Sequence, residues 1–122
     1  MTKQQLEDRL IDFAVLTVEL IDEIPNTRTG NHVTGQLVRS ATAPALNYGE
    51  ARSAESLNDF IHKLQIVLKE LRESFVALKI IRKTKLHIDE NKIRHLLKEC
   101  DELISIFVKS VQTANKKKLD LR

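Results

Sequence analysis

Polar residues recur at helical spacing in the middle of the chain, and their types suit ion pairing or ligand binding. They are Arg39, Asn47 and Glu50 in one segment, and Asp59, Lys63, Glu70 and Glu73 in the next. Residues three or four positions apart share a helix face. We favour a polar cluster between helices or subunits, in which paired charges fix the register. A ligand or nucleic-acid site using Arg39 and Lys63, or a solvated face with pairs such as Asp59–Lys63, are the alternatives.

Basic residues gather in two further places, and either group could attract a phosphate backbone. The first group is Lys79, Arg82, Lys83 and Lys85, and the second is Lys116, Lys117, Lys118 and Arg122, with Lys109 shortly before it. Binding of nucleic acid to either would weaken with salt. The simpler interpretation, which we favour, is complementation of a helix dipole for the first group and a solvated, disordered chain end for the second. No aromatic residue alternates with these groups, so binding would involve the phosphate backbone with little sequence specificity.

Residues for metal binding or catalysis form no known constellation. A di-iron bundle needs two Glu-x-x-His pairs, and the nearest approach, Asp59-Phe60-Ile61-His62, occurs once. His95 and Glu99 could share a face, but two ligands do not make a metal site. Cys100 falls in an apolar stripe, which favours a core position over a nucleophile. We expect no enzyme activity, metal, cofactor or small-molecule substrate.

Four amphipathic segments must position these residues. The 3–4 periodicity of apolar residues predicts helices over about 3–24, 31–52, 55–83 and from an Asp89 N-cap to about 115. Pro25 ends the first helix, Ser53 or Ser56 caps the third, and Pro44 should kink or divide the second. Short loops between long helices favour an all-α, antiparallel up-down-up-down four-helix bundle. We assign residues 1–115 to this bundle and residues 116–122 to a basic C-terminal tail.

Several segments carry more apolar residues than one bundle core needs. The additional ones are Val15 and Leu16, then Ile66, Val67 and Ile80, and finally Ile106 and Val108. An exposed apolar patch commonly marks an interface. We therefore predict a homo-oligomer.

The remaining composition sets broad limits on location and partners. The net charge is +3 in 122 residues, which permits an anionic partner without requiring one. The single cysteine, Cys100, allows no internal disulfide, which fits a reducing compartment. No apolar stretch is long enough to span a bilayer, and no signal peptide precedes the first helix, so we expect a cytoplasmic protein without a membrane partner.

The middle of the chain also resembles a known family. The stretch from Gln36 to Ala51, QLVRSATAPALNYGEA, is similar to the second-helix signature of the 23S ribosomal RNA intervening-sequence proteins, and residues 54–73 are similar to their third helix. Many relatives have Asn-Ile-Ala-Glu-Gly where this chain has Asn47-Tyr48-Gly49-Glu50-Ala51. The resemblance implies a four-helix bundle that tends to form a five-fold ring, and similarity to the nucleic-acid-binding accessory proteins of diversity-generating retroelements. It supplies no catalytic residues.

Two hypotheses for function follow. The first is a non-enzymatic homo-oligomer, a pentamer by the resemblance, that binds RNA or DNA, with rRNA foremost, through basic rims. The alternative is a protein-interaction adaptor or scaffold without a nucleic-acid ligand. Salt separates the two, because phosphate binding weakens steeply as salt rises and docking through apolar faces does not.

Overall fold

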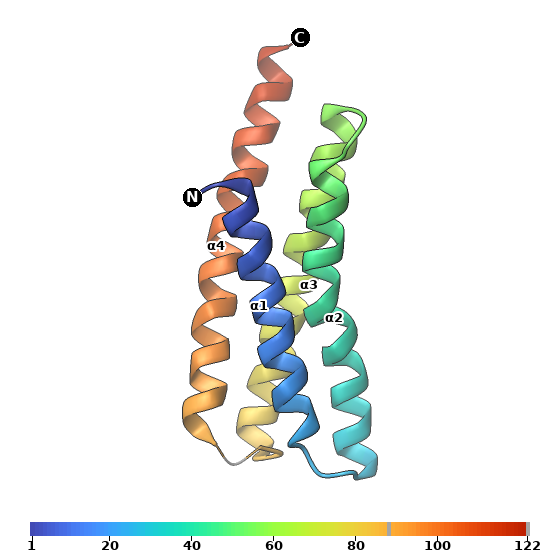
Figure 1. Cartoon of the computed structure of the whole chain (residues 1–122), viewed down its shortest axis with the longest axis vertical. Coiled ribbons are helices and arrows are strands. Elements are labelled where there is room, and N and C mark those ends of the chain that lie inside the picture. Colours follow the sequence, from blue (N-terminus) through green and yellow to red (C-terminus); the bar gives the residue numbers. More distant parts are fainter. Residues whose placement is uncertain (88, 122) are drawn as a thin grey trace.

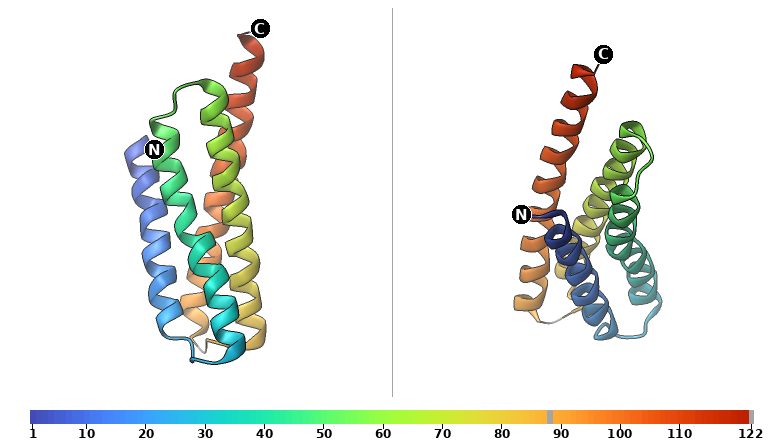
Figure 2. Two further views of the ribbon diagram at one scale, coloured as in Figure 1. Left: turned by 90° about the vertical axis from the view of Figure 1, so that its right-hand side faces the viewer. Right: turned by 45° about the horizontal axis from the view of Figure 1, so that its top comes forward.

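The computed structural model describes residues 1–87 and 89–121, and these form an antiparallel four-helix bundle (Figures 1 and 2). The helices are α1 (Lys3–Asp22), α2 (Arg28–Arg52), α3 (Leu57–Thr84) and α4 (Glu90–Asp120). The predicted all-α fold is confirmed. Arg122, which the sequence places in the basic tail, lies outside the described residues.

Hydroxyl and carboxylate side chains start each helix by accepting hydrogen bonds from its first free N–H groups. Thr2 forms a capping box with Gln5 at α1, and Thr27 accepts from the N–H of Gly30 at α2. Ser56 caps α3 and Asp89 caps α4, as the sequence predicts. Lys85 ends α3 in the left-handed conformation, with a φ of 58°.

The helices pack in chain order around a square, so that α1 contacts α2 and α4, and α3 contacts α2 and α4. In the described part of the chain, α1 and α3 do not contact each other and occupy diagonal corners. Both run in the same direction, from the upper to the lower end in Figure 1. Their outer faces therefore point away from each other.

Aliphatic side chains build the core with two phenylalanine rings. The largest fully buried side chains are Leu10, Phe13, Leu20, Leu37, Leu64, Val67, Leu71, Leu78, Ile81, Ile93, Leu103 and Phe107. Among the apolar residues that the sequence analysis placed outside the main stripes, Val67 is wholly buried, so that prediction is wrong for Val67. Ile66, Ile106 and Val108 are half-buried, while Val15, Leu16 and Ile80 are exposed.

All four helices differ from the predicted bounds by a few residues, and α2 and α4 depart furthest from the predictions. α4 continues past Asn115 to Asp120, because Lys116, Lys117 and Lys118 are good helix formers and nothing in this segment breaks the helix. α2 runs through Pro44 without dividing, although a proline there removes one backbone hydrogen bond. Buried packing of Ser40 and Ala41 against the bundle holds the turn before the proline in place.

Helix length differs across the bundle and leaves its upper end uneven. α1 has 20 residues, whereas α2 has 25, α3 has 28 and α4 has 31. The last turns of α4 consequently project beyond the start of α1 (Figure 1). Over the residues described, no helix combines the length and the apolar character needed to cross a membrane.

Candidate functional site: two charged faces and an end slot

Arg39 joins α2 to α3 through two carboxylates. Its Nη1 donates to Oε2 of Glu70 at 2.8 Å, and its Nη2 donates to Glu73. The hydrogen bond to Glu73, followed by the charge of Glu70, raises the pKa of Arg39. Only 7% of Glu70 is exposed, so this guanidinium compensates a carboxylate that has lost most of its water. This part of the predicted polar cluster lies between helices of one chain.

The other predicted members lie elsewhere on the same two helices. Lys63 donates to Oε2 of Glu50 at 2.6 Å, and this bond raises the pKa of Lys63. No Asp59–Lys63 ion pair is found among the described residues, because the ammonium group of Lys63 reaches across to α2 instead. Asn47 bonds to the carbonyl of Ala43 within α2. The structure therefore separates the predicted cluster into two inter-helix groups, Arg39 with two glutamates and Lys63 with one, and Asn47 and Asp59 lie outside both.

Sequence spacing missed the ion pairs that hold α1 to α4. Arg9 bonds to Glu99 at 2.6 Å and to Glu102 at 2.7 Å, and the hydrogen bond to Glu99 raises the pKa of Arg9. At the lower end, Lys92 pairs with Glu23 at 2.8 Å. These partners are far apart in the chain, so no local periodicity relates them.

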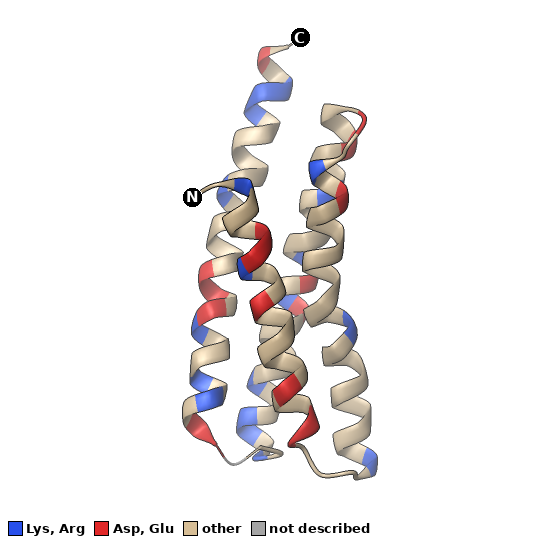
Figure 3. Cartoon of the chain, viewed as in Figure 1, with Lys and Arg blue, Asp and Glu red and all other residues tan. Residues whose placement is uncertain are grey.

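The outward side of α1 presents carboxylates around exposed aliphatic residues, and we call it the acidic face. It consists of six exposed residues at 3–4 spacing: Asp8, Ile11, Asp12, Val15, Glu19 and Asp22. Ile11 is 43% exposed and Val15 is 49% exposed. Within the described part of the chain, none of the four carboxylates has an ion-pair partner. Figure 3 shows these acidic residues along α1.

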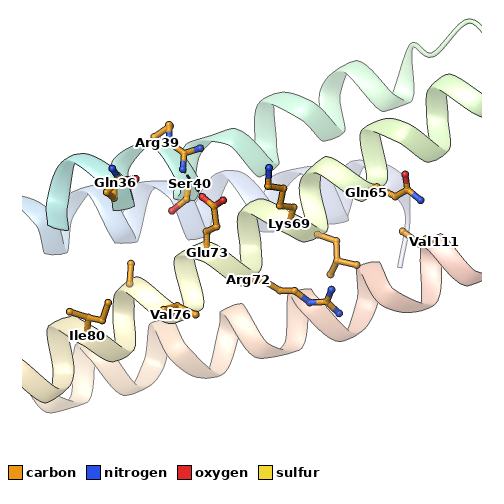
Figure 4. Close-up of a pocket in the computed structure, with 12 residues that line it drawn as sticks. Gln36, Arg39, Ser40, Gln65, Lys69, Arg72, Glu73, Val76, Ile80 and Val111 are labelled. Atoms are coloured by element: carbon orange, nitrogen blue, oxygen red, sulfur yellow. Dashed lines mark hydrogen bonds and ion pairs between the residues drawn. The ribbon is translucent and has the colours of Figure 1, made fainter. Parts of the chain in front are cut away.

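The outward side of α3 has the opposite charge, and we call it the basic face. Its six exposed residues are Lys69, Arg72, Val76, Lys79, Ile80 and Lys83. Val76 and Ile80 lie in a groove of about 840 Å³ that Arg39, Lys69 and Arg72 also line (Figure 4). Among the described residues that line this groove, Glu73 is the only carboxylate, and it is already paired with Arg39.

The two predicted basic groups lie at opposite ends of the bundle (Figure 3). At the lower end, Arg82 pairs with Glu90 at 2.7 Å, and the ammonium group of Lys79 lies 4.7 Å from the centre of the Phe75 ring. Lys79 and Lys83 belong to the basic face, and Lys85 is exposed beyond it. At the upper end, Lys116, Lys117 and Lys118 lie on the projecting turns of α4 and, within the described residues, form no ion pair.

A slot opens at the upper end, above the start of α1, and we call it the end slot. It has a volume of about 780 Å³. Its walls come mainly from α2, α3 and α4, with contributions from the first residue of α1 and from the loop between α2 and α3. The lining is Lys3, Tyr48, Ala51, Arg52, Ala54, Ser56, Leu57, Phe60, Leu64, Ile106, Lys109, Ser110, Thr113, Ala114 and Lys117. The Tyr48 ring packs edge-on against Phe107 at 5.5 Å below it, and burial raises the pKa of Tyr48. None of the described lining residues is acidic. Apart from Lys109 and Lys117, which the basic groups include or adjoin, the sequence analysis did not single out these residues for binding.

Cys100 lies in the core, as predicted. It is wholly buried, and its thiol donates to the carbonyl oxygen of Leu71 at 3.2 Å. Burial, with the nearby charges of Asp101 and Glu99, raises the pKa of Cys100 to about 12. The thiol is therefore protonated and shielded at neutral pH.

This raised pKa predicts a loss of stability at high pH. An unfolded thiol releases its proton near pH 9, while the folded thiol holds its proton to about pH 12. Between these values the folded state binds one proton more than the unfolded state, so the free energy of unfolding falls as pH rises, by up to about 1.4 kcal/mol per pH unit. Urea denaturation between pH 8 and 10.5 should show this decline in the wild type and a shallower decline in Cys100→Ala. Parallel curves for the two proteins would contradict the assignment.

Among the described residues, no group of three or more histidine, cysteine or acidic side chains could hold a metal ion. What the geometry offers is binding surface: two complementary outer faces, two basic ends and one apolar slot.

These features define a helical-bundle protein with two oppositely charged outer faces and a slot at one end. The chain matches the model of the 23S rRNA-intervening sequence protein family over residues 3–109 and belongs to that family. It is also similar to a solved structure, a protein of unknown function from the S23 ribosomal protein family of Bacteroides thetaiotaomicron. That similarity has a TM-score of 0.83 at 27% identity and covers 92% of this chain and 99% of the other. No curated protein matches the chain. The family resemblance inferred from residues 36–73 is thereby confirmed.

Proposed function

We propose that this protein is a non-enzymatic, cytoplasmic scaffold that binds a nucleic-acid backbone, rRNA foremost, at a basic end. Its copies associate side by side, each through one face of its own and a different face of its neighbour. The observation that carries the proposal is the match between the acidic face of α1 and the basic face of α3. Each has four charges of one sign around two exposed aliphatic residues, and among the described residues none of these charges forms an ion pair. Contact between copies would bury the aliphatic side chains and pair the charges.

The two faces also match in height along the bundle. Asp22 lies at the lower end of α1, and Lys83 lies at the lower end of α3. Because each helical residue rises about 1.5 Å, residues equally far from these ends lie level with each other. Asp8 lies as far from Asp22 along α1 as Lys69 does from Lys83 along α3, and Val15 is then level with Val76. A neighbour rotated about an axis parallel to the bundle would thus meet opposite charges and like apolar groups.

This contact joins two different faces, so each copy keeps one free face for the next. Such heterologous association closes into a ring or continues as a filament. The five-fold ring implied by the family resemblance is one closed form. Light scattering should give a mass several times 14.0 kDa, and a monomer at high concentration would end the proposal of self-association.

Nucleic acid is proposed to bind at the end formed by the projecting turns of α4. Lys79 and Lys83 are assigned to the contact between copies, and Arg82 pairs with Glu90, which leaves Lys85 at the lower end. Lys116 and Lys118 have no ion-pair partner among the described residues. A ring would repeat these cations around one rim, so that avidity strengthens a weak site.

A salt titration of RNA binding tests this assignment. We expect retention of duplex RNA on a filter to weaken by about tenfold between 50 and 200 mM salt for every two phosphates neutralised. Replacing Lys116 and Lys118 by glutamate should reduce the affinity and the salt slope. Replacing Arg28 and Lys98 by glutamate, both exposed and away from the projecting turns of α4, is the charge-matched control. Absence of RNA and DNA binding at low salt, or an equal loss in both variants, would reject the site.

A protein-interaction adaptor is the second candidate function. The end slot favours it, because an apolar floor adds nothing to phosphate binding.

A further inference from the structure

We propose that the end slot binds an acidic amphipathic helix of a partner protein. This inference stands independently of ring assembly and of RNA binding. It rests on the shape of the slot, on its apolar floor and on the sign of the charges around it.

The shape of the slot follows from the lengths of the helices. Lower in the bundle, α1 packs between α2 and α4. At the upper end α1 has not yet begun, and no fourth helix lies between the C-terminal turn of α2 and the second half of α4 (Figures 1 and 2), where the end slot is found. On α4 the lining runs from Ile106 to Lys117, which is about 17 Å, or three helical turns. A helix lying in line with α1 would restore the four-helix cross-section at this end.

The floor of the slot provides apolar anchoring. Leu64, Ala51 and Ala114 form its base and are buried, while Leu57, Phe60 and Ile106 are half-buried at its sides. A half-buried phenylalanine beside aliphatic residues is typical of a groove that receives the apolar stripe of an amphipathic helix. A nucleic acid offers no such stripe, so these side chains favour a helical peptide.

The charged residues at the rim of the slot indicate which charge the bound helix should carry. Lys3, Lys109 and Lys117 surround the opening, and in the described part of the chain none of them forms an ion pair. Arg52 also lines the slot, and its guanidinium already contacts Glu7 at 3.4 Å. Because the described lining holds four basic residues and no acidic one, a helix with glutamate or aspartate beside its apolar stripe is the complementary partner.

Fluorescence anisotropy with a labelled synthetic peptide tests the proposal. The probe is an amphipathic helix of about four turns, with leucine along one face and glutamate elsewhere, and a peptide of the same composition in scrambled order is its control. We expect the helical probe to bind and the scrambled one to bind at least about tenfold more weakly. Replacing Lys109 and Lys117 by glutamate should weaken binding of the helical probe by about tenfold or more. Replacing Lys98 and Lys116 by glutamate, which changes the net charge equally outside the slot, should leave it unchanged.

Phe60→Ser separates the apolar anchor from the charges. This substitution should weaken binding of the helical probe while leaving duplex RNA binding unchanged. Circular dichroism should confirm that the variant is folded. The charge variant on exposed lysines tests the slot even if Phe60→Ser unfolds. Equal binding of the two peptides, or equal weakening by the slot and control variants, would overturn the proposal. If the slot charge variant loses RNA binding but keeps peptide binding, the slot binds phosphate instead. If the mass of folded Phe60→Ser in solution falls to 14.0 kDa, the slot binds a second copy of the chain instead.

Discussion

Reversing the charges at Asp8 and Asp22 should reduce the mass of the protein in solution to that of a monomer. Asp8→Lys with Asp22→Lys would place lysines level with Lys69 and Lys83 of the neighbouring copy. Like charges then meet at both ends of the contact, and the exposed aliphatic area between them is small. The expected measurement is a light-scattering mass near 14.0 kDa, with unchanged helicity, because all four side chains are exposed.

A compensating change should restore the assembly. Lys69→Glu with Lys83→Glu alone should also give a monomer, whereas one chain carrying all four substitutions should again assemble. Such rescue isolates the interaction between the two faces from the effects of each change on the chain. Charge reversal at Glu55 and Asp101, which are exposed and lie outside both faces, is the matched control and should leave the mass unchanged. A four-residue variant that stays monomeric would show that α1 and α3 do not meet.

Removing the Phe107 ring should cost more stability than any surface change. Phe107 is wholly buried and meets the Tyr48 ring edge-on, with centroids 5.5 Å apart, so it joins α4 to α2. Phe107→Ala loses the transfer free energy of the ring and leaves a cavity, which together cost about 3–5 kcal/mol. The total free energy of unfolding of a domain of this size is about 5–15 kcal/mol, so the urea midpoint should fall sharply.

The matched control for Phe107 is another large apolar residue on the outside of the bundle. Leu46 is 68% exposed, and Leu46→Ala should change the free energy of unfolding by no more than about 0.5 kcal/mol. A similar loss for Leu46 and Phe107 would mean that the assigned core is wrong. Tyr48 lines the end slot and its ring rests on Phe107, so Phe107→Ala should also weaken binding of the acidic peptide.

The pattern of the sequence determined the elements and the architecture. Apolar residues at 3–4 spacing located all four helices, and Ser56 and Asp89 marked two helix starts, because capping and amphipathicity are local properties. The resemblance over residues 36–73 identified the family that the comparison over residues 3–109 then established. The end of α4 was misplaced, because a run of lysines interrupts the apolar pattern without interrupting the helix.

The sequence could not predict which charged residues on different helices form ion pairs. Arg39 was expected to take part in a polar cluster, but only the packed bundle showed that Glu70 and Glu73 hold it and that Lys63 pairs with Glu50 rather than with Asp59. Spacing within one helix limits which side chains share a face and says nothing about the rotation of the next helix. The pairing of Arg9 with Glu99 needed the same information.

The two outer faces and the end slot likewise depend on tertiary structure. Helical spacing in the sequence shows that the acidic residues share one side of α1 and the basic residues one side of α3. It does not show which sides of those helices face outward. Packing α1 and α3 at opposite corners made both faces available and set them in opposite directions. The short α1 beside the long α4 left the slot open, since the relative height of two helices is decided by how their side chains interlock and not by either pattern alone.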